Sequence, residues 1–137
     1  GRYRLVTFQI QSGNHIRAMA LVTLADHDLP DGENERTEAA PGEGPIDAAF
    51  NAILRIAGCT DVTLVSYEIR AVTEGTDALG EAIVKIKTGE SIFTGRGVST
   101  DIIKSSIKAY LNAVNKCLLG ALGDAENEGN GGNEDAS

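Results

Sequence analysis

Alternating apolar and polar residues open the chain and predict paired β-strands. An alternation of period two covers residues 4–11 and returns over residues 16–24, as expected of half-buried strands. The intervening Ser12-Gly13-Asn14 is a turn signal, so the two segments are predicted to form a hairpin. Residues 36–40 are predicted to add a short third strand, and their polar side chains favour a sheet edge.

The period then changes to that of an α-helix. Pro45 suits the first helical turn because its missing N–H would find no acceptor there, and Gly58 is a typical helix terminator. Between these two residues, apolar side chains recur at helical spacing, at positions 46, 50, 53 and 57. The pattern therefore predicts one helix in this segment.

The same order of elements is then written a second time. Strands are predicted over residues 62–73, around residues 82–86 and over residues 91–94, and a helix with an apolar stripe follows from Ile103 to Leu118. The segment 42–44 (Gly-Glu-Gly) is expected to correspond to 95–97 (Gly-Arg-Gly). The repeat predicts an α+β fold of two βββα units, at about residues 3–58 and 60–119, related by pseudo-twofold symmetry. Each unit has an antiparallel sheet and one helix.

The formal net charge of −8 is concentrated at the C-terminal end. Five of the 20 acidic residues and none of the 12 basic residues fall in residues 124–137, which hold no apolar side chain larger than alanine. Residues 123–137 are therefore predicted to be a disordered acidic tail, and residues 1–122 to be the folded domain. The domain is nearly neutral without a basic stripe, which argues against nucleic acid as a partner.

Cysteine usage and hydropathy bear on the location of the protein. Cys59 and Cys117 have no metal-ligand spacing, so we expect reduced thiols in the cytoplasm, with a single disulfide as the alternative. The sequence has no run of 18 apolar residues, so no membrane-spanning helix and no membrane partner are expected.

The two Gly-x-Gly segments are candidates for binding an anion. Glycines before a helix expose backbone N–H groups at the positive end of the helix dipole, which suits a phosphate or a carboxylate. Neither segment matches a phosphate-binding P-loop or a dinucleotide-binding motif. Taken alone, each segment is better explained by a tight strand-to-helix turn, whereas their symmetric repetition favours a shared ligand site.

Catalytic groups are scarce along the chain. His15 and His27 lie in predicted turns, with no partner at metal-ligand spacing. Asp47 suits the positive end of the first helix, and it could also accept a hydrogen bond from a ligand ammonium group. Since no nucleophile, base and oxyanion site come together, the sequence predicts a binding module. A purely structural dimerisation module and a small phosphate- or nucleotide-binding enzyme stay open as alternatives.

Four segments, read in order, carry a family resemblance over residues 3–119. They are YRLVTFQIQSG (3–13), GEGPIDAAFNAI (42–53), VTEGTDALGEAIVKI (72–86) and GRGVSTDIIKSSIKAYLNAVN (95–115). Together they resemble the C-terminal regulatory domain of 2-isopropylmalate synthase, and citramalate synthase carries a similar domain. The resemblance implies a homodimer with an allosteric site for leucine between the two βββα units, for feedback inhibition of leucine biosynthesis. Isoleucine is the effector that a citramalate synthase domain would imply.

The resemblance also implies a catalytic partner. In this family, a separate (β/α)₈ barrel uses a divalent metal to condense acetyl-CoA with 2-oxoisovalerate. This sequence holds no such barrel, so the chain is expected to bind no cofactor and to be inactive by itself.

The ligand contacts follow from the same resemblance. The polar end of the amino acid would meet the first glycine segment, and its side chain would meet an apolar wall in the second unit. The implied contacts are Gly42, Gly44, Ile46, Asp47, Leu64, Tyr67, Ala71, Ala78 and Val98. On a regular strand Leu64 and Tyr67 face opposite sides, so a bulge would be needed for both to line one pocket.

Overall fold

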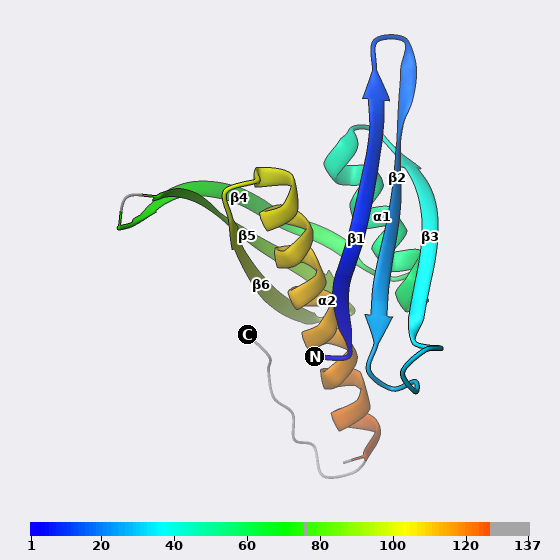
Figure 1. Cartoon of the computed structure of the whole chain (residues 1–137). Helices are drawn as coiled ribbons and strands as arrows, with labels where there is room; N and C mark the ends of the chain where they lie inside the picture. The colour runs from blue at the N-terminus through cyan, green and yellow to red at the C-terminus, as the bar shows by residue number, and fades with distance from the viewer. Residues whose placement is uncertain (76, 127–137) are drawn as a thin grey trace. The chain divides into compact units, whose positions relative to one another are not determined.

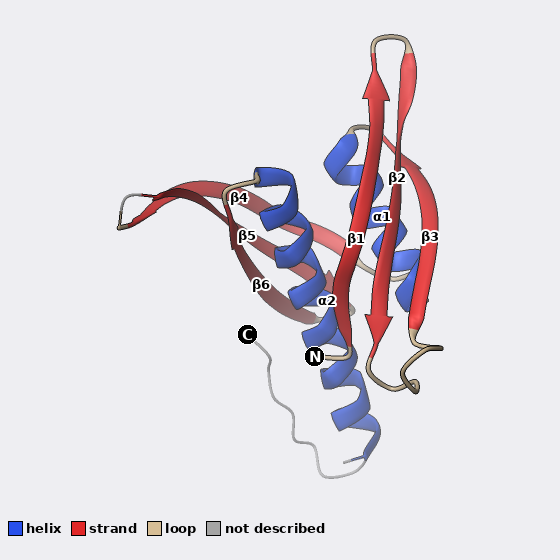
Figure 2. Ribbon diagram, in the orientation of Figure 1, coloured by secondary structure: helices blue, strands red, loops and turns tan. Residues whose placement is uncertain are grey.

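The chain folds into two successive βββα units (Figure 1). The structure, a computed structural model, describes residues 1–75 and 77–126. One compact unit covers Arg2–Thr60 and the other begins at Asp61. In each unit a three-stranded antiparallel sheet is followed by one helix that lies on a face of that sheet (Figure 2), so the predicted α+β class is confirmed.

The first unit has the strand order β1-β2-β3, all antiparallel. Its elements are β1 (Tyr3–Gly13), β2 (Ile16–Asp26), β3 (Glu35–Gly42) and α1 (Pro45–Ala57). The third strand lies at a sheet edge, as its polar side chains predicted. Gly58 ends α1 in the left-handed conformation, with φ of 74°, and its N–H donates to the carbonyl of Leu54.

The second unit repeats this topology with the order β4-β5-β6. Its elements are β4 (Thr63–Glu74), β5 (Asp77–Thr88), β6 (Ser91–Ser99) and α2 (Ile102–Glu126). The sequence prediction was wrong about β6, which continues through 95–97 instead of ending at residue 94. It continues because both of its glycines pair with β5 as ordinary strand residues. Helix α2 also runs past residue 123, and the rest of the predicted tail, 127–137, lies outside the described residues.

Each core forms between the central strand and the helix of its own unit. Every second residue of β2 from Ala18 to Leu24 is buried, and the same alternation buries Ala82, Val84 and Ile86 on β5. The buried residues of α1 are at positions 48, 49, 50, 52 and 53. Among the buried residues of α2, positions 107, 110, 111 and 114 recur at the spacing of one helix face. The cores are mostly aliphatic, although Tyr3 and Phe50 are buried in the first unit and Phe93 and Tyr110 in the second.

Side chains of each helix also bond the outer edge of its sheet. In the first unit, Asn51 Nδ2 donates to the carbonyl of Pro41 at 3.0 Å, and Arg55 Nη1 donates to that of Ala39 at 2.6 Å. In the second unit, Asn112 and Lys116 donate to two carbonyls of β6, those of residues 96 and 94, both at 2.7 Å. These bonds satisfy carbonyl groups of β3 and β6 that no neighbouring strand reaches.

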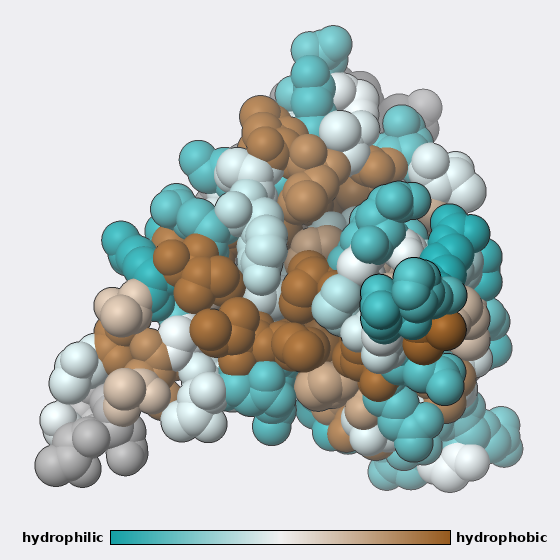
Figure 3. Space-filling view, turned by 90° about the horizontal axis from the view of Figure 1, so that it is seen from above, coloured by the Kyte–Doolittle hydropathy of each residue, from teal (hydrophilic) through white to brown (hydrophobic). Residues whose placement is uncertain are grey.

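Large apolar side chains stay exposed in both units, and Figure 3 shows such side chains in brown at the surface. In the first unit they include Met19 and Leu21, which alternate with the buried residues of β2 and so face away from α1. In the second unit they include Leu64, Val98 and Ile102. None of the described helices is long and apolar enough to cross a membrane.

Candidate ligand-binding site

The start of α1 has no side chain that caps it. Its N-cap residue is Gly44, in an extended conformation with φ of −158° and ψ of 178°, and Pro45 follows without an N–H. The first intrahelical bond runs from the N–H of Ala48 to the carbonyl of Gly44 at 2.9 Å. The N–H groups of Ile46 and Asp47 therefore have no acceptor within the helix. An anion at this end would meet two donors and the positive end of the helix dipole.

Asp47 fixes the loop in front of this helix. Its Oδ2 accepts a hydrogen bond from the N–H of Glu43 at 2.8 Å, and its side chain is exposed. An acidic residue in the first turn also stabilises the helix through its dipole, as the sequence predicted. The carboxylate remains within reach of solvent, where it can face a cation.

The two glycines of the first segment have different structural roles. Gly42 is buried, and a Cβ built on it would collide with the backbone of Asp47 and Ala48, so only glycine lets β3 pass this close to α1. A Cβ on Gly44 would meet nothing within 4 Å. Gly44 therefore borders open space beside the helix start, whereas Gly42 is explained by packing.

The second glycine segment is not a loop. Gly95 and Gly97 lie within β6, and a Cβ on either would collide with the backbone of α2, at Ala109 in both cases. The strand register corrects the predicted correspondence, because Gly42 pairs with Ala18 of its sheet as Gly97 pairs with Ala82. Gly97 is thus the counterpart of Gly42, and no glycine of the second unit takes the place of Gly44.

The start of α2 is capped by its own chain. Asp101 Oδ1 accepts hydrogen bonds from the N–H groups of Ile103 at 2.9 Å and of Lys104 at 3.4 Å. Ser99 Oγ accepts a further one from the N–H of Asp101 at 3.1 Å. A carboxylate of the protein thus occupies the position that an anion would take, so the two helix starts differ in their capacity to bind one.

A bulge in β4 aligns three of the predicted apolar contacts. The register against β5 shifts between residues 64 and 66, so Leu64, Tyr67 and Ala71 pair with Ile86, Val84 and Gly80. These partners alternate regularly along β5, which places all three β4 residues on the face that carries α2. Leu64 and Ala71 are exposed there, and Tyr67 is half-buried.

The two other predicted contacts of the second unit lie apart from each other. Ala78 pairs with Thr73 near the β4–β5 turn, on the α2 face by its register, and it is exposed. Val98 pairs with Glu81 on the opposite face, and its side chain is 43% exposed. On that face Glu81 forms ion pairs with Arg70 at 3.0 Å and Arg96 at 3.8 Å.

Ser106 is a polar contact of the predicted wall that sequence reasoning missed. Its hydroxyl lies 2.6 Å from that of Tyr67. The available signal was a pair of serines, at positions 105 and 106, inside an otherwise apolar helical stripe. The pattern of apolar residues predicted the helix but assigned these serines no role.

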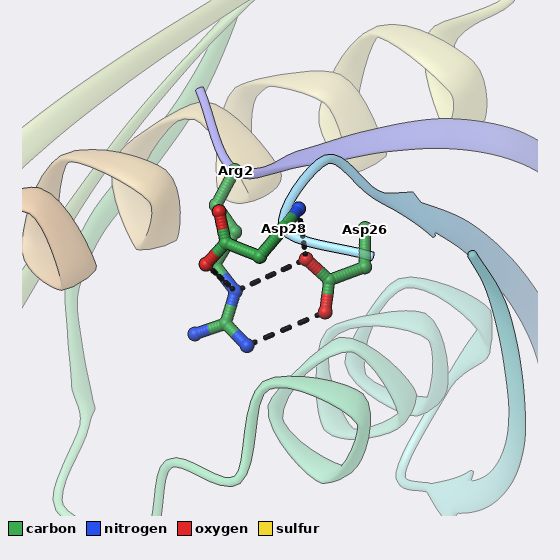
Figure 4. A network of polar contacts seen from close by, with 3 residues as sticks. All are labelled: Arg2, Asp26 and Asp28. Carbon is green, nitrogen blue, oxygen red and sulfur yellow. Dashed lines mark hydrogen bonds and ion pairs between the residues drawn. The ribbon is translucent and has the colours of Figure 1, made fainter. Parts of the chain in front are cut away.

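A second polar cluster, shown in Figure 4, closes the long loop after β2. Asp26 is 2% exposed, and its carboxylate accepts hydrogen bonds from Arg2 Nε at 3.2 Å, Arg2 Nη2 at 3.3 Å and the N–H of Asp28 at 3.0 Å. The bond from Arg2 holds the pKa of Asp26 below its ordinary value, against the opposing effect of burial. The backbone N–H of Asp26 donates to the carbonyl of Asn34 at 2.7 Å. The cluster thus serves to hold the ends of this loop.

The described residues offer little for chemistry. No group of three or more His, Cys, Asp or Glu side chains among them could hold a metal ion. Burial raises the pKa of the half-buried Cys59, which keeps it a thiol at neutral pH. The arrangement at the start of α1 can bind an anion but presents no nucleophile.

The chain matches a known family of regulatory domains. Residues 1–118 match the family described as the LeuA allosteric (dimerisation) domain. A 2-isopropylmalate synthase of Ruminiclostridium cellulolyticum is 53% identical over 112 residues, which are 82% of this chain and 21% of the relative. Another, of Carboxydothermus hydrogenoformans, is 50% identical over 118 residues, 85% of this chain and 22% of the relative.

A relative of a second description is also similar to the chain. A protein of Archaeoglobus fulgidus described as an (R)-citramalate synthase is 44% identical over 115 residues, 83% of this chain and 22% of the relative. The chain thus spans about a fifth of the length of the relatives it matches.

Proposed function

The chain belongs to the family of LeuA allosteric (dimerisation) domains, and from this premise we propose that it is the regulatory domain of a 2-isopropylmalate synthase and binds leucine as a feedback inhibitor. The most similar relatives described above are 2-isopropylmalate synthases. In this proposal the cytoplasmic parent enzyme supplies the catalytic barrel, with its divalent metal and acetyl-CoA.

The uncapped start of α1 is the observation that carries the proposal. The α-carboxylate of an amino acid can accept hydrogen bonds from the N–H groups of Ile46 and Asp47, beside Gly44. The exposed carboxylate of Asp47 is suited to the ammonium group. The second helix offers no equivalent place because Asp101 caps it.

The apolar part of the ligand is assigned to the second unit. Leu64, Tyr67 and Ala71 share one face of their sheet, and two of them are exposed enough to contact a ligand side chain. Ala78 is on the same face by register, and its small side chain leaves room for branching at Cγ. Val98 stays in the proposed set, although it lies on the other face of the sheet.

Self-association is part of the proposed function. Both units leave large apolar side chains exposed, such as Met19 and Leu21 on the side of the first sheet that α1 does not cover. Burying such side chains in a second copy would stabilise a homodimer, in keeping with the dimerisation role in the family description.

A calorimetric titration of the chain with amino acids tests the proposal. Leucine is expected to bind more tightly than isoleucine, and isoleucine more tightly than valine, since one methyl group changes binding by about 1–3 kcal/mol. A preference for isoleucine would instead favour the citramalate synthase assignment that one relative supports. Absence of binding by all three would leave the dimerisation module as the function.

Two substitutions at Gly44 test the placement of the carboxylate. Gly44→Asp puts a carboxylate at the N-cap, so it should leave the free energy of unfolding equal or raise it by about 0.5 kcal/mol while abolishing leucine binding. Gly44→Ala is the matched control, because its Cβ enters open space without a competing charge, and it should retain binding. Leucine binding by Gly44→Asp with unchanged affinity would remove the site from this loop.

A further inference from the structure

Two neighbouring serines are buried in the first turns of α2. Ser105 and Ser106 both have 0% exposed surface, although serine usually lies near water. Both hydroxyls donate to the backbone carbonyl of Ile102, at 3.0 Å from Ser105 and at 2.8 Å from Ser106. Ser106 differs from its neighbour in one contact, because its Oγ also lies 2.6 Å from the phenolic oxygen of Tyr67.

The chemistry of these groups fixes the direction of the hydrogen bonds. A carbonyl oxygen can only accept, and a serine hydroxyl has one hydrogen to donate. When Ser106 donates to Ile102, its oxygen must therefore accept from the hydroxyl of Tyr67. Tyr67 thus donates to Ser106, and Ser106 donates to the backbone of α2. Linked hydrogen bonds of this kind polarise and strengthen one another inside a protein.

This contact connects the helix to the far edge of the sheet. Helix α2 packs on β5 and β6, whereas Tyr67 belongs to β4, the opposite edge strand. The first turns of α2, yellow in Figure 1, are the part of the helix that meets Tyr67. Tyr67 is itself half-buried, and Leu64 and Ile69 on the same face of β4 are 44% and 37% exposed. The bond to Ser106 thus fixes the hydroxyl end of a ring that stays partly exposed.

The first unit has no counterpart of this contact. Asn51 and Asn112 bond equivalent carbonyls of β3 and β6, so they mark equivalent points on the two helices. Six residues before each asparagine, α1 has Pro45 at its first position, whereas α2 has Ser106 after an additional turn. A proline at this equivalent position has no hydroxyl, so only the serine of α2 can make the contact.

We propose that Ser106 is a positioning residue for the amino-acid effector, because it holds the ring of Tyr67 in the orientation that receives the ligand side chain. The inference rests on the proposed function, in which Tyr67 lines the apolar part of the site. Without the bond, the ring populates other orientations, and the apparent affinity falls with the fraction that remains competent to bind. A buried hydrogen bond of ordinary strength corresponds to a change of about 2- to 10-fold.

The neighbouring serine provides a matched control. Ser105→Ala and Ser106→Ala each remove a fully buried hydroxyl and one bond to the same carbonyl, but only Ser106→Ala removes a hydroxyl that bonds Tyr67. Calorimetric titration with leucine should give a Kd about 2- to 10-fold higher for Ser106→Ala and an unchanged Kd for Ser105→Ala. Tyr67→Phe removes the donor from the other end and should raise the Kd by a similar factor. The double variant of Tyr67 and Ser106 should be no worse than either single variant.

The outcomes separate this inference from the function on which it rests. Failure of the unmodified chain to bind leucine overturns the proposed function, and the role of Ser106 with it. If the unmodified chain binds leucine and the two serine variants bind it with equal affinity, the role of Ser106 alone is overturned. Fully additive effects of Tyr67→Phe and Ser106→Ala overturn it as well, because they show that the two hydroxyls act separately. If Ser106→Ala does not fold, the Kd values of Tyr67→Phe and Ser105→Ala decide instead. A Kd raised only in Tyr67→Phe supports the role of Ser106, and equal Kd values overturn it.

Discussion

Replacing Arg2 by methionine should destabilise the first unit through the charge it leaves behind. Arg2 donates from two nitrogens to the carboxylate of Asp26, which is 2% exposed and keeps only the N–H of Asp28 once the guanidinium is gone. The methionine side chain can preserve much of the packing of Arg2 over the ring of Tyr3, whose centroid lies 5.0 Å from the guanidinium carbon. Hydrogen bonds to a charged group contribute about 1.5–3 kcal/mol. The Arg2 side chain is 41% exposed, so water replaces part of this and the expected loss is about 2 kcal/mol.

The pH dependence of this loss distinguishes charge from packing. In the unmodified chain, Arg2 holds the pKa of Asp26 below its ordinary 3.8, so the ionised pair contributes stability above about pH 4 that is lost as the pH falls through the folded-state pKa. In Arg2→Met, burial is opposed only by the N–H of Asp28 and the charge of Arg36, so the pKa of Asp26 should be higher than in the unmodified chain and the variant should lose less stability as the pH falls. The difference in stability between the two proteins should therefore narrow from pH 7 toward pH 3.

Urea unfolding at a series of pH values measures this difference. The midpoints of the unmodified chain and Arg2→Met should be well separated at pH 7 and should converge in acid. The matched control is the same pair in an Asp26→Asn background, which removes the buried carboxylate. The separation should be small there at every pH, because the remaining ion pair of Arg2 with the exposed Asp28 contributes little. A separation that stays equally large at pH 7 and pH 3 would refute the electrostatic explanation, since only a loss of packing is independent of pH.

Two further substitutions test the packing of α2 on its sheet and the protection of the β6 edge. Gly97→Ala places a Cβ against the backbone of α2 at Ser105 and Ala109, so it should lower the free energy of unfolding by at least about 2 kcal/mol in chemical denaturation; a loss below 0.5 kcal/mol would show that the helix moves aside easily. Lys116→Met removes the donor to the carbonyl of Thr94 on the β6 edge, so light scattering on mild heating should detect more association than in the unmodified chain; unchanged scattering would mean that the edge is protected by other means.

The repeat of elements was predictable because periodicity alone identifies it. Alternation of period two marked the hairpins, and the change to a helical period at Pro45 marked the first helix to the residue. The polar third strand was also placed correctly at an edge. These predictions succeeded because the sheet and the helix of each unit bury one face against each other. The buried face appears in the sequence as a regular spacing of apolar residues.

The second glycine segment was misread because a glycine carries no hydropathy signal of its own. Before α1 the chain turns almost directly from β3 into the helix, and the same turn was expected after residue 94. In fact β6 continues to Ser99, since its glycines pack against α2. Whether a glycine serves a turn or a close approach depends on the partner across from it, which the sequence does not name.

The candidate site was predictable only in part, for a similar reason. A strict alternation would have placed Leu64 and Tyr67 on opposite faces, and a bulge at one residue places them together. Nothing in the local sequence distinguishes this bulge from a regular strand. The contact between Tyr67 and Ser106 joins residues far apart in the chain, so only the folded structure brings it out.

The same repeat that makes the two units alike makes their difference informative. Two identical units would present two identical helix starts, and both would bind an anion or neither would. Here Gly44 and Pro45 leave one helix start without a side-chain cap, while Asp101 closes the other with a carboxylate of the chain. Ser106 follows the additional turn, at the position of α2 that corresponds to Pro45, and it bonds Tyr67. The additional turn of α2 ends in a helix start that Asp101 closes, and the residue after this turn bonds Tyr67. The proposed division follows from this difference, with the polar end of the ligand assigned to the first unit and the apolar end to the second.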